Sequence, residues 1–133
     1  MFKILALEDA AARELYCREC GIVPDAGSLA YAALDIADSG ESSLIAVCTF
    51  TLSGGEVSRI SIGYTDIEDE AVLILLFTVA DFLRRCGFAS IEADCTVEPF
   101  AARVGFERNG DGTFMLDLTA PHGCEKSRGE ATT

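Results

Sequence analysis

A chain of 133 residues is long enough for one domain with a single core and too short for two domains of ordinary size. Its 22 acidic and 10 basic residues give a formal charge of −12, which excludes the basic surface that nucleic acids or anionic membranes usually require. The longest uninterrupted apolar run, Ala71–Phe77, is far below the roughly 20 residues that cross a bilayer, so no membrane-spanning helix is expected.

The first strand and the first helix are predicted from a change in apolar spacing. Phe2–Leu7 is almost entirely apolar and predicts a strand. Asp9–Cys20 follows helical spacing, and Gly21 ends it. The residues expected on the apolar face of this helix are Ala11, Ala12, Leu15 and Tyr16.

Three antiparallel strands should follow this helix, because polar or glycine-rich turns separate three apolar segments. Their expected bounds are Leu29–Ile36, Leu44–Leu52 and Glu56–Gly63.

A long helix and a closing hairpin complete the predicted elements. Glu68–Arg85 has acids in its first turn and arginines in its last, and Gly87 follows, which are the preferences of helix ends. The remaining elements are a strand at Phe88–Cys95, a short helix at Pro99–Val104 and a hairpin of Phe106–Arg108 with Thr113–Leu118.

Three segments, EVSRISI at Glu56–Ile62, LRRCGF at Leu83–Phe88 and FAARVGF at Phe100–Phe106, together resemble the GNAT superfamily of N-acetyltransferases. Glu56–Ile62 is similar to the central strand of that family. Leu83–Phe88 is similar to the end of its long helix, and Phe100–Phe106 to its Phe-Tyr-x-x-Leu-Gly-Phe segment. The order of the predicted elements agrees with the family over about residues 2–118.

The resemblance implies an α/β (α+β) fold class, with a mixed, mostly antiparallel central sheet flanked by helices. It implies a single GNAT-like domain at residues 1–119, and we expect the polar tail at residues 120–133 to be disordered. It also implies acetyl-CoA as the cofactor and an amine as the acyl acceptor.

The phosphate-binding loop departs most from the family. There, an Arg/Gln-x-x-Gly-x-Gly/Ala loop lets backbone N–H groups approach the CoA pyrophosphate at a helix N-terminus. The matching positions here are Ile67, Glu70 and Val72, and Glu68–Glu70 places negative charge where the diphosphate would lie. Glu70, Ala71 and Val72 are thus the cofactor-binding positions by register. We expect acetyl-CoA to bind weakly or not at all, although such acids also stabilise a first helical turn.

One catalytic position of the family is matched. Glu56 aligns with the central-strand carboxylate that serves as general base, while the general-acid tyrosine of many members falls at Ala101. An acid after two glycines at the start of a strand is also typical of a solvated surface, and both interpretations stay open.

A backbone slot is implied at Ile60, Ser61 and Ile62. In the GNAT fold the central strand separates from its neighbour there, leaving N–H and C=O groups that can pair with the pantetheine arm. Three occupants of such a slot stay open: an acyl-CoA, a peptide strand, or water alone.

Six cysteines are scattered over the predicted elements, which is typical of small buried apolar residues rather than of a disulfide framework. Cys17 and Cys20, together with His122 and Cys124, offer two short-spaced pairs that suit tetrahedral zinc. The second pair lacks a typical spacing. We therefore predict no metal site, with a zinc or redox module as a minor alternative.

Two functions remain open. The first is an N-acetyltransferase-like protein that transfers an acyl group from acetyl-CoA to a small amine or peptide. The second is a non-catalytic GNAT-fold pseudoenzyme that acts as a binding or regulatory module. The acidic composition favours a cationic ligand, and we expect no nucleic-acid or membrane partner. Because Glu8 and Asp9 interrupt the apolar N-terminus, unlike in a signal peptide, we expect a cytoplasmic protein.

A homodimer is predicted from the long helix. Val72–Phe77 is apolar around more than a full turn, so only part of it can face the sheet. If Leu75, Val79 and Phe82 point inward, the opposite face at Leu73 and Phe77 needs cover from another helix or a second subunit.

Overall fold

The computed structural model describes residues 1–25, 27–52, 56–65 and 69–119. The predicted tail, as well as Ile67 and Glu68 of the phosphate-binding loop, lies outside these residues.

The strands of the described residues form one sheet of seven, in the order β1-β2-β3-β4-β5-β7-β6. All neighbours are antiparallel except β4 and β5, which are parallel. The strands are β1 (Phe2–Ala6), β2 (Leu29–Ile36), β3 (Ser42–Phe50), β4 (Val57–Tyr64), β5 (Ser90–Ala93), β6 (Glu107–Arg108) and β7 (Phe114–Asp117). The predicted mixed, mostly antiparallel sheet is confirmed.

The helical elements are α1 (Ala10–Glu19), α2 (Asp69–Arg85), the 3₁₀ helix η1 (Cys95–Phe100) and α3 (Ala101–Val104). The short predicted helix at Pro99–Val104 is therefore longer than expected at its N-terminal side. Asp94 starts it early, because its carboxylate accepts the Thr96 N–H as an N-cap.

The predicted apolar face of α1 is only partly right: Ala12 and Tyr16 are half-buried, and Tyr16 packs against the buried cluster that contains Cys17 and Cys20. Leu15 is 46% exposed and Ala11 is exposed, whereas Cys17 and Cys20 are buried. The prediction gave cysteine too little weight as an apolar residue, and the helix is turned so that its two thiols face the sheet.

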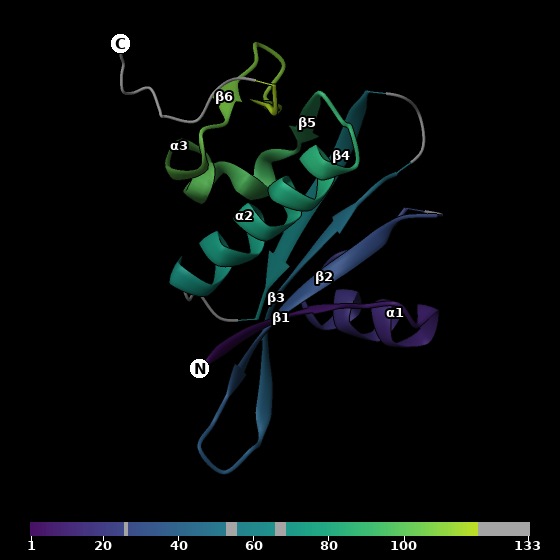
Figure 1. Cartoon of the computed structure of the whole chain (residues 1–133), viewed down its shortest axis with the longest axis vertical. Coiled ribbons are helices and arrows are strands. Elements are labelled where there is room, and N and C mark those ends of the chain that lie inside the picture. Colours follow the sequence, from purple (N-terminus) through teal and green to yellow (C-terminus); the bar gives the residue numbers. More distant parts are fainter. Residues whose placement is uncertain (26, 53–55, 66–68, 120–133) are drawn as a thin grey trace.

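The sheet carries α2 on one face and α1 on the other. Because side chains alternate along a strand, Ala46 and Cys48 of β3 belong to the α2 core, while Val47 between them packs with α1. Figure 1 shows α2 lying across the strands, with α3 beside it.

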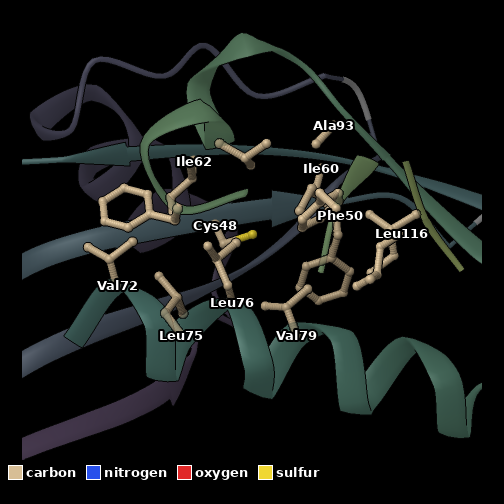
Figure 2. Close-up of a cluster of buried hydrophobic side chains, with 14 of the residues drawn as sticks. Cys48, Phe50, Ile60, Ile62, Val72, Leu75, Leu76, Val79, Ala93 and Leu116 are labelled. Atoms are coloured by element: carbon tan, nitrogen blue, oxygen red, sulfur yellow. The ribbon is translucent and has the colours of Figure 1, made fainter. Parts of the chain in front are cut away.

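The main core lies between α2 and the sheet. Figure 2 shows the buried side chains of α2 pointing toward Cys48, Ile60 and Ile62 of the sheet. These α2 residues are Val72, Leu75, Leu76 and Val79, each 0–2% exposed.

The outward face of α2 is close to the prediction. Leu75 and Val79 are fully buried as expected, Phe82 is partly buried, and Phe77 is 51% exposed. Ile74, at 39% exposed, takes the outward place predicted for the partly buried Leu73. Over the described residues, none of the helices is long and apolar enough to cross a membrane.

Candidate functional site

Strands β4 and β5 separate near the middle of β4. They pair only from Val57–Ile60 to Ser90–Ala93, after which β5 gives way to η1. The predicted separation of the central strand from its neighbour lies here, next to Ile60, Ser61 and Ile62.

Alternation of the backbone groups decides which of these residues face the gap. Thr51 N donates to Arg59 O at 3.2 Å, and Thr65 N donates to Ile45 O at 2.8 Å, both across β3 and β4. Odd-numbered residues of β4, including Ser61, therefore direct their backbone toward β3. Ile60 and Ile62 direct theirs toward β5. Ile62 is therefore the first residue beyond the paired segment whose backbone faces the gap.

The gap is bridged by the protein's own side chains. The Ile62 N–H donates to Thr96 Oγ1 at 3.1 Å, and the Thr96 hydroxyl donates in turn to Asp94 Oδ1. Ser61 Oγ donates to Asp94 Oδ2 at 2.7 Å. We call these four residues the Asp94–Thr96 clasp. Because Thr96 already accepts the Ile62 N–H, a carbonyl of a pantetheine arm would have to displace it.

The N-terminus of α2 is acidic and partly neutralised. Glu70 is exposed, and the Asp69 carboxylate lies 3.4 Å from Arg103 Nη2, where the guanidinium also stacks over the Phe100 ring. A phosphate at this helix end would meet Glu70 directly and would compete with Asp69 for Arg103.

The other two loop positions belong to the core. Ala71 and Val72 are both 0% exposed. Val72 stands where the family has Gly or Ala, and Figure 2 shows its side chain among the buried residues. These positions can therefore offer a ligand only their backbone.

Glu56 lies apart from the gap. It is exposed and precedes β4, and its carbonyl accepts the N–H groups of Ala89 and Ser90 at 2.9 and 3.2 Å. Six residues of extended chain, about 20 Å, separate it from Ile62. The structure thus does not bring Glu56 together with the predicted backbone slot. Ala101, in the position of the general-acid tyrosine, is 5% exposed.

An acidic cavity opens on the α1 face of the sheet, beside the clasp. Its volume is about 270 Å³. The lining comes from the α1–β2 connection, from β3, β4 and β5, and from the β6–β7 turn. Its polar residues include Asp25, Ser61, Glu92, Asp94 and Thr113.

Charge in this cavity favours a cation. Its described lining has three carboxylates, from Asp25, Glu92 and Asp94, and one guanidinium, from Arg59. Arg59 Nε is already 3.1 Å from Glu92 Oε1, which leaves the other two carboxylates without a cationic partner from the cavity wall. A ligand ammonium at 4 Å from one carboxylate gains about 1 kcal/mol in water and up to about 4 kcal/mol at a protein surface.

Sequence reasoning missed Asp25, Glu92 and Asp94. Alternation along β5 could have found two of them, since Glu92 and Asp94 alternate with the apolar Ile91 and Ala93 and so share one polar face. Asp25 could not have been found, because its place in the cavity wall depends on the tertiary fold.

The cysteines behave as predicted for small buried residues in three of five described cases. Cys17, Cys20 and Cys48 are buried and free, and Cys86 and Cys95 are exposed and free. Burial raises the pKa of Cys20 to about 11, with further contributions from Cys17 and Glu19, and burial likewise raises the pKa of Cys17. Zinc binding and redox exchange both need a thiolate, so this pair is a poor metal or redox site. His122 and Cys124 lie outside the described residues, within which no cluster could hold a metal ion.

No protein-family model matches the sequence, and no curated protein matches it. Solved structures nevertheless share the fold. A candidate acetyltransferase from an Exiguobacterium species has a TM-score of 0.60 at 16% identity, over 96% of this chain and 99% of the other. A GNAT-family acetyltransferase from Staphylococcus aureus has a TM-score of 0.61 at 12% identity, over 89% and 99%. Mutant forms of the spermidine/spermine N-acetyltransferase from Vibrio cholerae have a TM-score of 0.62 at 12% identity, over 89% and 95%.

The chain has the GNAT fold, and the predicted resemblance is confirmed at the level of architecture. At these identities the likeness concerns the fold alone.

Proposed function

We propose that this protein is a GNAT-fold binding protein for a small organic amine, which it holds as a cation in the acidic cavity beside β4 and β5. The observation that carries this proposal is the cavity wall, where three carboxylates face one guanidinium that is already paired. The acetyltransferase from Vibrio cholerae that shares the fold acts on the polyamines spermidine and spermine, which supports an amine as the ligand class.

Two features support a role that does not depend on tightly bound acetyl-CoA. In the gap between β4 and β5, the Ile62 N–H already donates a hydrogen bond to the Thr96 hydroxyl. Asp69 and Glu70 lie at the helix end where a pyrophosphate would need positive charge. We therefore expect calorimetry to give a dissociation constant for acetyl-CoA weaker than about 10 μM, or roughly −7 kcal/mol. A tighter constant would contradict the proposal.

Amine binding can be tested by substitution of the cavity carboxylates. Asp94→Asn keeps an acceptor for the Thr96 N–H but removes the charge, so the affinity for spermidine or a short diamine should fall about tenfold, or 1.4 kcal/mol. Isothermal titration at low ionic strength measures this loss. Asp25→Asn should weaken binding in the same direction.

The matched control is Glu41→Gln. It removes one negative charge at the exposed turn before β3, away from the cavity lining, and should leave the affinity unchanged. Equal losses in Glu41→Gln and Asp94→Asn would show that only the overall charge attracts the amine. No amine binding by the unmodified protein would overturn the proposal.

A second candidate function is acyl transfer, favoured by the parting of β4 and β5 after Ile60 and Ala93. If the clasp alone keeps the slot closed, Thr96→Ala should free the Ile62 N–H and raise the affinity for acetyl-CoA severalfold, by about 1 kcal/mol for one hydrogen bond. Thr96→Ser keeps the hydroxyl and serves as the control. An unchanged affinity in Thr96→Ala would argue against a pantetheine slot in this chain.

A further inference from the structure

One stripe of α2 faces away from the core along the whole helix. Its residues recur at alternating spacings of four and three, which is one face of a helix: Glu70, Ile74, Phe77, Asp81 and Arg84. The buried residues Val72, Leu75, Leu76, Val79 and Leu83 occupy the opposite face. The centre of the stripe is apolar, since Ile74 and Phe77 are 39% and 51% exposed, and its ends are charged.

A groove runs beside the centre of this stripe. It has a volume of about 280 Å³, and Asp81 and Arg84 line it together with apolar side chains. The apolar lining consists of Phe77, Ala80, Val104, Leu116 and Leu118. An exposed aromatic ring next to an apolar groove on the same surface suits a two-fold interface, because each copy then supplies both the ring and the groove.

The charges of the stripe are complementary to themselves. Glu70 and Arg84 each lie about two helical turns, or 10 Å, from Phe77, on opposite sides of it. A two-fold axis through Phe77 would therefore place Glu70 of one copy against Arg84 of the other, twice. Within the helix Asp81 pairs with both Arg84 and Arg85, so Arg85 can keep Asp81 neutralised while Arg84 turns to Glu70 of the other copy.

We propose that the protein forms a homodimer in which the α2 helices of two copies pack antiparallel, with the two Phe77 rings at the centre and the apolar groove of each copy filled by the partner. Antiparallel packing also brings opposite ends of the two helix dipoles together. The net charge of −12 opposes association, but at physiological salt charges farther apart than about 8 Å are largely screened. This proposal goes beyond the proposed function and does not depend on it.

Sedimentation equilibrium and light scattering of the full chain test the dimer. The mass should rise from 14.2 kDa toward twice that value as the concentration increases to about 500 μM. Phe77→Glu should raise the dissociation constant of the dimer by about 30-fold or more, because it places two carboxylates at the centre of the interface. Leu15→Glu, at an exposed apolar residue of α1, is the matched control and should leave the dissociation constant of the dimer unchanged. A constant mass of 14.2 kDa over the whole range would overturn the proposal.

A charge-exchange experiment tests the antiparallel register itself. Glu70→Lys alone and Arg84→Glu alone should each weaken self-association, because each variant sets like charges against each other twice. In an equimolar mixture, the introduced lysine of one chain faces the introduced glutamate of the other, while native Glu70 faces native Arg84. The mixture should therefore contain heterodimers, seen by native mass spectrometry after isotope labelling of one variant.

Circular dichroism first checks that each variant is folded, since both substitutions oppose the helix dipole of α2. Heterodimers in the mixture, together with weaker homodimers of each variant, are the expected result. Homodimers of each variant as strong as those of the unmodified chain would overturn the antiparallel register. A mixture that associates no better than its components would overturn it as well.

Discussion

Gly63→Ala is expected to lower the free energy of unfolding by about 2–4 kcal/mol, a large effect for the addition of one methyl group. Gly63 lies within β4 and is buried where the α1–β2 connection crosses the sheet. A Cβ atom at this position would lie 2.4 Å from the Cys20 carbonyl oxygen and 2.7 Å from Ile22 Cγ1. The Ile22 side chain can rotate, but the carbonyl belongs to the C-terminal cap of α1 and can move only with the backbone.

Urea denaturation measures this loss as a lower midpoint with an unchanged slope. Gly110→Ala is the control, because no atom lies within 4 Å of a Cβ at Gly110 and its φ is not in the left-handed region. Its stability should stay within about 0.5 kcal/mol of the unmodified protein. If both variants are equally stable, α1 does not hold its position against β4 as tightly as these distances indicate.

The strands and the long helix could be predicted because local signals decide them. The bounds of β2 agree with the prediction at both ends, and α2 ends at Arg85 as expected from Gly87 after it. In both cases the apolar spacing and the helix-stop or turn residues point to the same element. Gly63 shows the limit of such signals. In the sequence it resembles a residue that ends a strand. In the structure a glycine is required there because the backbone of Cys20, some forty residues earlier, lies too close for a side chain.

The candidate site could be predicted less well, because it depends on side chains from separate segments. The resemblance correctly located the separation of β4 from β5 near Ile60–Ile62. It could not show that Thr96 bridges this gap, since a threonine shortly after a strand has many possible partners. The same holds for Asp94, which is an N-cap, a partner of Ser61 and a wall of the acidic cavity at once.

Asp94 belongs both to the clasp and to the acidic cavity, so it takes part both in closing the backbone slot and in the proposed binding of an amine. Asp94 accepts hydrogen bonds from Ser61, from the Thr96 hydroxyl and from the Thr96 N–H, all of which are neutral donors. Its charge is therefore available to a cation in the cavity while its geometry holds Thr96 against Ile62. Because these hydrogen bonds and an ion pair can use the same carboxylate, amine binding in the cavity is expected to be compatible with a closed backbone slot.

Val72→Gly, which restores the family's small residue, should cost about 3–4 kcal/mol of stability instead of creating a phosphate site. The Val72 side chain is 0% exposed in the core between α2 and the sheet. Its removal gives up the burial of a whole aliphatic side chain and leaves a cavity. Glycine in the first turns of α2 adds up to about 1 kcal/mol through helix propensity.

Thermal unfolding should report this change as a fall of about 10–15 °C in Tm. Glu70→Gly at the neighbouring loop position is the matched control, because the Glu70 side chain is exposed and only helix propensity, about 1 kcal/mol, is lost. A Val72→Gly variant as stable as Glu70→Gly would mean that the core closes around the missing side chain. The expected result would mean that this position carries valine rather than glycine because the valine side chain packs α2 against the sheet. A glycine that binds phosphate could then replace it only if larger neighbouring core side chains filled the space.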